Sequence, residues 1–484
     1  MVRIHVIYFD INTGYFPGVN HGLASLAAAV REKSHFFSFQ HLSKIESAEI
    51  VANRAIKNNP DVIGFSFGTN QRQYVSNYAQ ILYQKTKILQ IAGGIHPTID
   101  PLDVFKIKPI TGVCIGEGEY SVQELLSRID NKEDIYTIPS FWWRSSNRDL
   151  IRNPVHPLDP DLSNLPFPDY SIFDTEGISK ASSGWVAMLL IRGCPYNCYY
   201  CCNHVLRNIY PRKEHYFRIP PVKYAINLIK HNLGFYKDSN GINFADDLLT
   251  FNSDWLDEFT NAYSKEIGLP YTCNSRIECL SDRVVRALKG SGCKTVYIGV
   301  ESGNEEIRKK LLNRHHSNKD IIEAFQKLKK ANISTFSYNI VGFPFETKEQ
   351  MEETLKINKI IKPDMGIVFY LYPYPGTKLF TISKEHNLLL SDKEGGNISG
   401  YLERPAIKFT HCKRKDCIKM YNKMQLFLIS QGVVTGLKLP PFFGKIFYWF
   451  TNINSAFWIN VFTKDSKFKF IIRKIFFKYF FNAL

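Results

Sequence analysis

The chain has few cysteines and lacks the marks of a secreted protein. Ten cysteines are spread over 484 residues without the paired spacing of a disulfide scaffold. No basic segment followed by an apolar run precedes the first strand-like stretch, residues 2–9. Internal repeats and low-complexity segments do not stand out either. These absences argue against a disulfide-rich secreted domain and predict a cytoplasmic protein in a reducing compartment. With 44% hydrophobic and 22% charged residues, the chain is expected to form about three folded domains.

Three of the cysteines form the most informative stretch of the sequence. Cys194, Cys198 and Cys201 have C-x3-C-x2-C spacing and follow a short apolar run, residues 185–191. Three thiolates at this spacing can hold three irons of a 4Fe-4S cluster and leave the fourth iron without a protein ligand. A zinc knuckle is the alternative, but such a site usually has four ligands, and the nearby candidates are only Cys202 and His204.

This spacing, with Tyr200 before the last cysteine and Gly193 before the first, resembles the signature of the radical S-adenosylmethionine (SAM) superfamily. The resemblance implies that the open iron chelates the amino and carboxylate groups of SAM. It also implies an electron donor, such as flavodoxin or ferredoxin, whose electron leads to cleavage of SAM into a 5′-deoxyadenosyl radical.

Further motifs follow in the order of that superfamily. Asp246 and Asp247 follow one strand-like run, Arg276 follows the next run, and Glu301 follows the one after that. Gly342 begins a G-x-P-x-E-T turn. The resemblance implies that Arg276 neutralises a carboxylate or contacts the ribose, that Glu301 binds ribose hydroxyls and that the Gly342 turn backs the adenine. Taken singly, each motif is also compatible with an ordinary turn, helix cap or core ion pair.

Strand-like and helical segments alternate from residue 185 onward. This alternation is typical of βα units around a parallel sheet, here a partial (β/α)6 barrel. The expected strands lie near 185–191, 241–245, 270–274, 294–300, 334–341 and 366–372, and the expected helices near 222–232, 253–267, 282–289, 319–331 and 348–361.

The first 130 residues predict a separate doubly wound, Rossmann-like α/β domain. Small residues stand where its strands should end, which lets a bulky ligand approach the backbone. These residues resemble the Ser/Thr and Gly-Gly elements of the cobalamin-binding domain that precedes the radical domain in one branch of the superfamily. The resemblance implies cofactor contacts from Ser66, Gly93, Gly94, Gly116 and Glu117.

Two further absences limit which cofactor ligands and additional clusters the chain can have. None of the thirteen histidines has an Asp two residues earlier, so the chain has no D-x-H-x-x-G motif and a lower axial histidine for cobalt is not expected. His96 is interpreted as a loop residue or one held by a dipole, rather than as a ligand. Only Cys114 lies in the first 190 residues, which argues against methylthiotransferases with a second N-terminal cluster. After Cys293 only Cys412 and Cys417 remain, too few for auxiliary clusters.

The domain prediction therefore has four parts. A cobalamin-binding-like domain covers 1–135, a Pro-, Asp- and Ser-rich linker 136–183, a radical SAM barrel 184–385 and a helical, basic-aromatic region 386–484.

Part of the net charge of +16 lies in the last segment of the chain. Residues 440–484 contain seven Lys or Arg, one Asp and twelve Phe. Polar residues within the uncharged stretch 446–463 disfavour a membrane span, so an element lying in the membrane interface fits better. A C-terminal helix packed on the barrel remains an equal alternative. No nucleic-acid partner is expected because no such module is recognisable.

The resemblance implies methylation of an unactivated carbon. The basic-aromatic segment 440–484 favours a lipid as the substrate, with a natural product as the alternative. Two alternatives stay open. One is a ring closure, ring contraction or C–C rearrangement with the same cofactors, and the other is an iron-sulfur redox or binding protein without radical chemistry.

Overall fold

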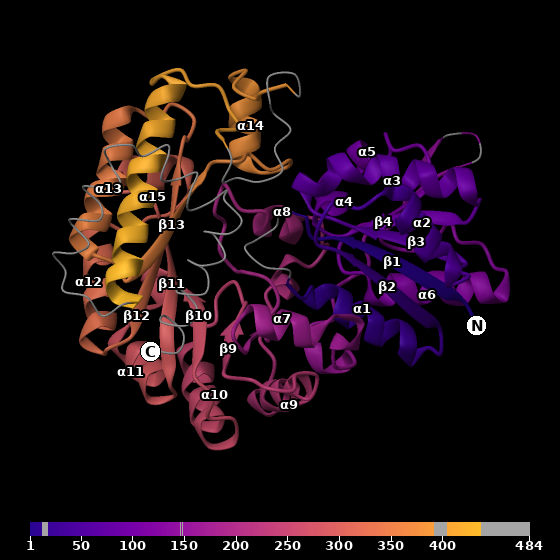
Figure 1. Ribbon diagram of the computed structural model, residues 1–484, viewed down its shortest axis with the longest axis horizontal. Coiled ribbons are helices and arrows are strands. Elements are labelled where there is room, and N and C mark those ends of the chain that lie inside the picture. The colour runs from indigo at the N-terminus through magenta and orange to yellow at the C-terminus, as the bar shows by residue number, and fades with distance from the viewer. Residues whose placement is uncertain (12–17, 146, 148, 392–403, 437–484) are drawn as a thin grey trace.

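The computed structural model describes residues 1–11, 18–145, 147, 149–391 and 404–436. Two sheets organise the described chain, and each belongs to a different half of the molecule (Figure 1). The first has seven strands in the order β2-β1-β3-β4-β5-β6-β7. Its strands are β1 (Arg3–Phe9), β2 (Phe36–Leu42), β3 (Val62–Ser66), β4 (Leu89–Gly93), β5 (Gly112–Cys114), β6 (Phe141–Arg144) and β7 (Leu150–Arg152), and its helices are α1 (His21–Glu32), α2 (Ala48–Lys57), α3 (Arg72–Lys85), α4 (Ile95–Ile99), α5 (Pro101–Val104) and α6 (Glu119–Asn131).

Helices cover both faces of this first sheet. Successive side chains of a strand point to opposite faces, so Ile4 and Val6 of β1 pack with α1 and α6, whereas Ile7 and Phe9 pack with α2 and α3. Strands β1 to β5 are parallel. Their carboxyl ends therefore meet at one edge, as expected for a doubly wound domain.

The stretch that the sequence indicates as a linker also contributes to this sheet. Strands β6 and β7 pair antiparallel beyond β5. They form because Phe141 and Trp143 alternate into the core, where their rings stack 5.0 Å apart, and because Gly112 leaves room for the indole of Trp143. Three- and four-residue strands among prolines and aspartates carry too short a pattern to be recognised in the sequence.

The second sheet is parallel throughout, in the order β13-β12-β11-β10-β9-β8. All six predicted barrel strands are present, so the predicted α/β fold class is confirmed. The strands are β8 (Trp185–Met188), β9 (Gly241–Phe244), β10 (Tyr271–Ser275), β11 (Cys293–Glu301), β12 (Ser334–Val341) and β13 (Met365–Tyr370), and the helices of this half are α7 (Thr175–Ala181), α8 (Asn203–Asn208), α9 (Val222–Leu233), α10 (Ser253–Glu266), α11 (Asp282–Gly290), α12 (Asn318–Lys330), α13 (Lys348–Ile361), α14 (Lys378–Glu385) and α15 (Arg414–Gly436).

Local sequence signals explain where the barrel helices begin. Ser317 and Asp320 form a reciprocal capping box at α12, and Thr347 and Gln350 form another at α13. In Figure 1, α12 and α13 lie on the side of the sheet that is turned away from the N-terminal half. The other side of the sheet is thereby left for the site.

Helix α15 packs against the last strand of the barrel. Tyr421 of α15 stacks on Tyr370 of β13 with ring centroids 4.1 Å apart, and Gln425 accepts the backbone N–H of Val368 at 3.1 Å. Within the described residues no helix is long and apolar enough to cross a membrane. The predicted interfacial segment 440–484 lies outside the described residues.

Candidate active site

The three predicted cluster cysteines lie on the loop after β8, between the two sheets. Asp246 holds the start of this loop, because its Oδ1 accepts the backbone N–H groups of Leu190 at 2.9 Å and Ile191 at 2.5 Å. Asp246 is fully buried and burial raises its pKa to about 7, while its Oδ2 has no hydrogen-bond partner. The structure thus places this predicted cofactor residue as a support for the cysteine loop.

Cys198 is buried, and Cys194 and Cys201 are partly buried. The three sulfurs are close enough to influence one another, and burial raises the pKa of Cys194 to about 12 and that of Cys201 to about 11. Among the described side chains, no three His, Cys, Asp or Glu residues converge as a site for a single metal ion. Because the pKa values of these thiols are raised, binding of iron would have to displace their protons.

Arg276 supplies a positive charge to this thiol group. Its Nη1 lies 2.9 Å from the Sγ of Cys198, and its guanidinium stands over the ring of Tyr196 at 3.7 Å from the centroid. Glu278 holds the other end of the guanidinium at 2.8 Å. A fixed cation at this point favours thiolate and any carboxylate beside it, which fits the role that the sequence implies for Arg276.

Tyr200 and Glu301 form one buried network with a residue that the sequence analysis did not single out, Arg314. Oε1 of Glu301 accepts the hydroxyl of Tyr200 at 2.9 Å and Nη1 of Arg314 at 3.0 Å. Glu301 has a φ of 62° at an irregularity in the pairing of β11 with β12, which makes this position special in the strand. Burial raises the pKa of Glu301 in spite of the arginine.

Asp247 connects the second barrel strand to the cysteines through Asn203. Nδ2 of Asn203 donates to Oδ2 of Asp247 at 3.1 Å and lies 3.5 Å from the Sγ of Cys201. The hydroxyl of Tyr216 donates to Oδ1 of the same amide at 2.7 Å. These bonds fix the orientation of the Asn203 amide next to the thiol.

The Gly342 turn is closed by the carboxylate of Glu346. Oε2 accepts the backbone N–H groups of Gly342 at 2.6 Å and Phe343 at 3.1 Å, and Gly342 has a φ of 85°. Burial raises the pKa of Glu346 to about 8, and its Oε1 has no partner. The turn is therefore held rigidly at the end of β12.

A cavity of about 550 Å³ joins this barrel edge to the carboxyl ends of the first sheet. This volume lies within the usual range for ligand pockets, about 300–1,000 Å³. From the first sheet it is lined by all five predicted positions, Ser66, Gly93, Gly94, Gly116 and Glu117, and from the barrel side by residues that include Leu189, Leu190, Ile191, Arg192, Gly193 and Asp247.

Two glycines in this cavity have backbone conformations and surroundings that disfavour a side chain. Gly94 has a φ of 99°, and an added Cβ would lie 3.2 Å from the carbonyl oxygen of Phe67 and 3.3 Å from Oγ of Ser66. Gly116 has a φ of 86°, and an added Cβ would lie 2.5 Å from the hydroxyl of Tyr210. Neighbouring protein atoms already lie where a Cβ would be placed, so the packing of these strand ends requires glycine at both positions.

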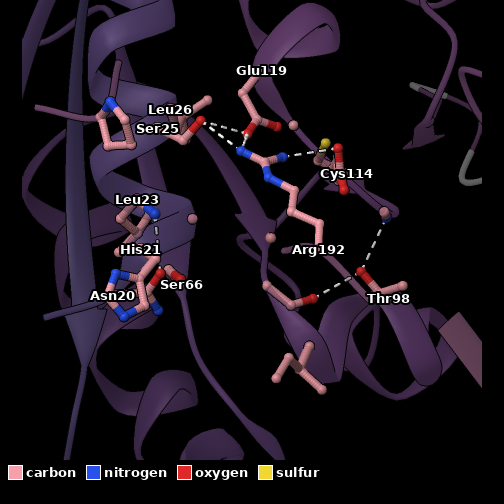
Figure 2. Close-up of a pocket in the computed structure, with 18 of the residues that line it drawn as sticks. Asn20, His21, Leu23, Ser25, Leu26, Ser66, Thr98, Cys114, Glu119 and Arg192 are labelled. Atoms are coloured by element: carbon pink, nitrogen blue, oxygen red, sulfur yellow. Dashed lines mark hydrogen bonds and ion pairs between the residues drawn. The ribbon is translucent and has the colours of Figure 1, made fainter. Parts of the chain in front are cut away.

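Buried ion pairs connect the two halves at the cavity wall. Arg192, two residues before Cys194, lies 2.9 Å from Glu117 and 2.8 Å from Glu119, and its Nη2 also donates to Oγ of Ser25 at 2.8 Å (Figure 2). Arg218 pairs with Glu117 as well. Glu117 thus lines the cavity and also holds the cysteine loop against the N-terminal domain.

Sequence reasoning missed several residues of this site: Arg192, Asn203, Tyr216, Arg218 and Arg314. Each is defined by partners distant in the chain, as Arg192 is by Glu117. The position of Arg192 beside the Gly193-Cys194 motif was the one local signal available.

Two family profiles match the chain. The radical SAM superfamily profile matches residues 188–357, and the B12 binding domain profile matches residues 10–126. The first covers the cysteine loop and strands β9 to β12, and the second covers strands β2 to β5.

Curated relatives are similar over most of the chain. The uncharacterized methyltransferase PH0819 of Pyrococcus horikoshii is 26% identical over 374 residues, which are 76% of this chain and 79% of that protein. The anaerobic magnesium-protoporphyrin IX monomethyl ester cyclase of Rubrivivax gelatinosus is 24% identical over 66% of this chain and 58% of its own length. The bacteriochlorophyllide d C-12(1)-methyltransferase of Chlorobaculum tepidum is 25% identical over 61% of this chain and 60% of its own length.

Solved structures share the fold. The cobalamin-dependent SAM radical enzyme OxsB, with aqua-cobalamin and SAM bound, has a TM-score of 0.70 at 15% identity, covering 97% of this chain and 74% of its own. The radical SAM methyltransferase TsrM from Kitasatospora setae has a TM-score of 0.66 at 14% identity, covering 79% of this chain and 76% of its own.

Proposed function

The chain belongs to the radical SAM superfamily, in the branch with an N-terminal B12-binding domain, and from this premise we propose that it methylates an unactivated carbon of a lipid or natural-product substrate. The predicted cofactors, a 4Fe-4S cluster, SAM and cobalamin, follow from the two domains. When bound, the cluster and SAM supply a radical that removes a substrate hydrogen, and cobalamin supplies the methyl group.

One observation carries the proposal. The cavity lined by Ser66, Gly93 and Gly94 is also lined by Gly193, which precedes Cys194, and by Asp247, so the two proposed cofactor sites lie next to each other. We propose that Cys194, Cys198 and Cys201 hold the cluster and that Arg276, Asp247, Glu301 and the Gly342 turn surround SAM. Ser66, Gly93 and Gly94 would face cobalamin.

The cavity wall supports an apolar substrate. Many of its side chains are aliphatic or aromatic, and a wall of this kind excludes water from reactive intermediates. Among them are Leu162, Leu165, Leu189, Leu206, Tyr210, Tyr216 and Leu228.

Ring closure is the second candidate, because cyclases are among the similar proteins. Anaerobic turnover with SAM labelled in its methyl group, a one-electron donor such as flavodoxin or ferredoxin, and a cell lipid extract separates the two. Methyl transfer predicts both S-adenosylhomocysteine and 5′-deoxyadenosine and a labelled product by mass spectrometry. Formation of 5′-deoxyadenosine and a changed substrate without S-adenosylhomocysteine would favour cyclisation. Absence of 5′-deoxyadenosine under reducing conditions would contradict both and favour a redox or binding protein.

A further inference from the structure

His21 brings an imidazole to the cavity although the sequence has no D-x-H-x-x-G motif. It is the first residue of α1, at the end of the connection that follows β1, and it lines the cavity together with Ser66 and Gly94. Figure 2 shows His21 grouped with Asn20 and Ser66, away from Arg192. His21 therefore belongs to the wall that the N-terminal sheet provides, opposite the wall that leads to the cysteine loop.

One ring nitrogen of His21 is held and the other is not. Nδ1 lies 2.5 Å from the hydroxyl of Tyr170, a buried side chain, and the two rings meet edge to face. Within the described residues no side chain or backbone group bonds Nε2. The tautomer that carries the proton on Nδ1 donates it to the hydroxyl oxygen of Tyr170 and leaves a free lone pair on Nε2, as in metal-ligating histidines.

The surroundings of His21 keep its ring neutral. Burial, together with the positive charge of Arg192, lowers the pKa of His21 to about 4. At neutral pH the imidazole therefore needs to lose no proton before it can bind a metal.

His96 offers a contrast on the same side of the molecule. Its Nδ1 lies 3.3 Å from Oγ1 of Thr69 and its Nε2 lies 3.3 Å from Oδ2 of Asp103. Both nitrogens are occupied within the protein, as expected for the non-ligating role that the sequence predicts for His96.

We propose that Nε2 of His21 is an axial ligand of the cobalt of bound cobalamin, on the face turned toward the N-terminal sheet, with Tyr170 orienting the ring through Nδ1. This inference rests on the proposed cobalamin-dependent function. It revises the expectation that no lower axial histidine is present, because that expectation rested on a motif and not on the position of the side chain. Imidazole nitrogen is a suitable ligand for a transition metal of this kind.

The test is electron paramagnetic resonance of the anaerobic protein loaded with cob(II)alamin. The unpaired electron of cob(II)alamin lies along the axial direction, so an axial nitrogen splits the cobalt lines. Protein made with 15N-histidine and natural-abundance cobalamin separates the sources. A histidine ligand gives doublets, whereas the benzimidazole of cobalamin itself gives triplets and a water ligand gives no nitrogen splitting. We expect doublets in the labelled wild type and triplets in unlabelled protein.

Two variants identify the histidine. H21A should lose the doublets in labelled protein, and the control H96A should keep them. Triplets in labelled wild type, absence of nitrogen splitting, or doublets that persist in H21A would each overturn the inference. If H21A does not fold, H21Q takes its place, and the labelled wild type remains decisive by itself. Failure of the wild type to take up cobalamin would instead overturn the cobalamin-dependent function, and this inference with it.

Discussion

Arg192 and Glu119 form an ion pair of 2.8 Å across the boundary between the two halves of the molecule. The glutamate begins α6 of the B12-binding domain, and the arginine lies two residues before Cys194, the first of the three cysteines proposed to hold the cluster. A displacement of either domain would therefore reach the cysteine loop through this pair. The geometry of the cluster site depends on the N-terminal domain as well as on the barrel.

Breaking this pair should destabilise the protein. Only 6% of the Glu119 side chain is exposed, so Arg192→Met leaves an uncompensated buried carboxylate. Loss of one partner of a buried pair costs about 3–5 kcal/mol. We expect the lower part of this range for the free energy of unfolding in urea, because the Arg192 side chain is 19% exposed. The double variant Arg192→Met/Glu119→Gln should recover part of the loss, and an additive double variant would contradict the coupling.

The cysteine variants test the cluster. Cys194→Ala, Cys198→Ala or Cys201→Ala should each abolish the bound cluster and SAM cleavage, because each thiolate is predicted to hold one iron. Iron analysis should find about four irons per chain in the reconstituted wild type. Cys202→Ala is the matched control and should keep both cluster and cleavage. Cleavage by a variant that lacks all three cysteines would contradict the central assignment.

Gly94→Val tests the cavity edge. Gly94 lines the cavity proposed for cobalamin and has a φ of 99°, and a side chain there would press on Phe67 and Ser66 and so displace the strand end that is proposed to face the cofactor. Cobalamin uptake, measured by absorbance after gel filtration, should fall at least tenfold. A residue forced into such a backbone region costs about 1–3 kcal/mol. Gly292→Val controls for this cost, because Gly292 also has a positive φ, 89°, but faces open space. Equal uptake by both variants would remove Gly94 from the site.

The free energy of unfolding should fall as pH rises, because the pKa of Glu346 is raised in the folded protein. Burial raises its pKa to about 8 in the folded protein from an ordinary value of 4.5. The folded state therefore keeps a proton that the unfolded state loses, so this contribution is complete below about pH 4.5 and is lost as pH rises to about 8. Urea unfolding of the cofactor-free protein at several pH values should show this decline.

Glu346→Gln should flatten that part of the profile, because the amide oxygen can still accept the two N–H groups of the Gly342 turn. Glu352→Gln, on the exposed face of α13, should keep the wild-type slope. A Glu346→Gln variant with the full wild-type slope would assign the decline to other groups, of which buried Asp246, with its pKa raised to about 7, is one.

The sequence predicted the barrel well because its signals are local. Amphipathic helices such as α13 begin at capping residues, and strands such as β13 are apolar runs, so their bounds follow from short windows. The site was predictable only where residues stand in motifs. Tyr200 and Glu301 were both singled out, but their bond and its third member, Arg314, depend on how the loop after Cys201 folds back on β11.

His21 shows the same limit of prediction from sequence. His21 has no motif around it, and its partner Tyr170 is 149 residues away. No spacing rule connects a residue at the start of α1 with one in the segment before the barrel. They come together because the segment around Tyr170 packs on the core of the N-terminal domain.

The basic-aromatic segment 440–484 gives the last prediction, which rests on sequence alone. Its seven Lys or Arg and twelve Phe are the composition of a segment that lies in the interface of an anionic membrane. In flotation assays the full chain should bind vesicles that contain anionic lipid, and binding should weaken as salt rises, because ions screen the basic residues over about 10 Å at 0.1 M. Removal of residues 440–484 should abolish flotation and leave SAM cleavage intact. Vesicles of neutral lipid are the control for purely apolar binding. An intact chain that binds neither kind of vesicle, together with a truncated chain that becomes insoluble, would show that residues 440–484 pack on the protein, and the substrate would then be sought among soluble natural products.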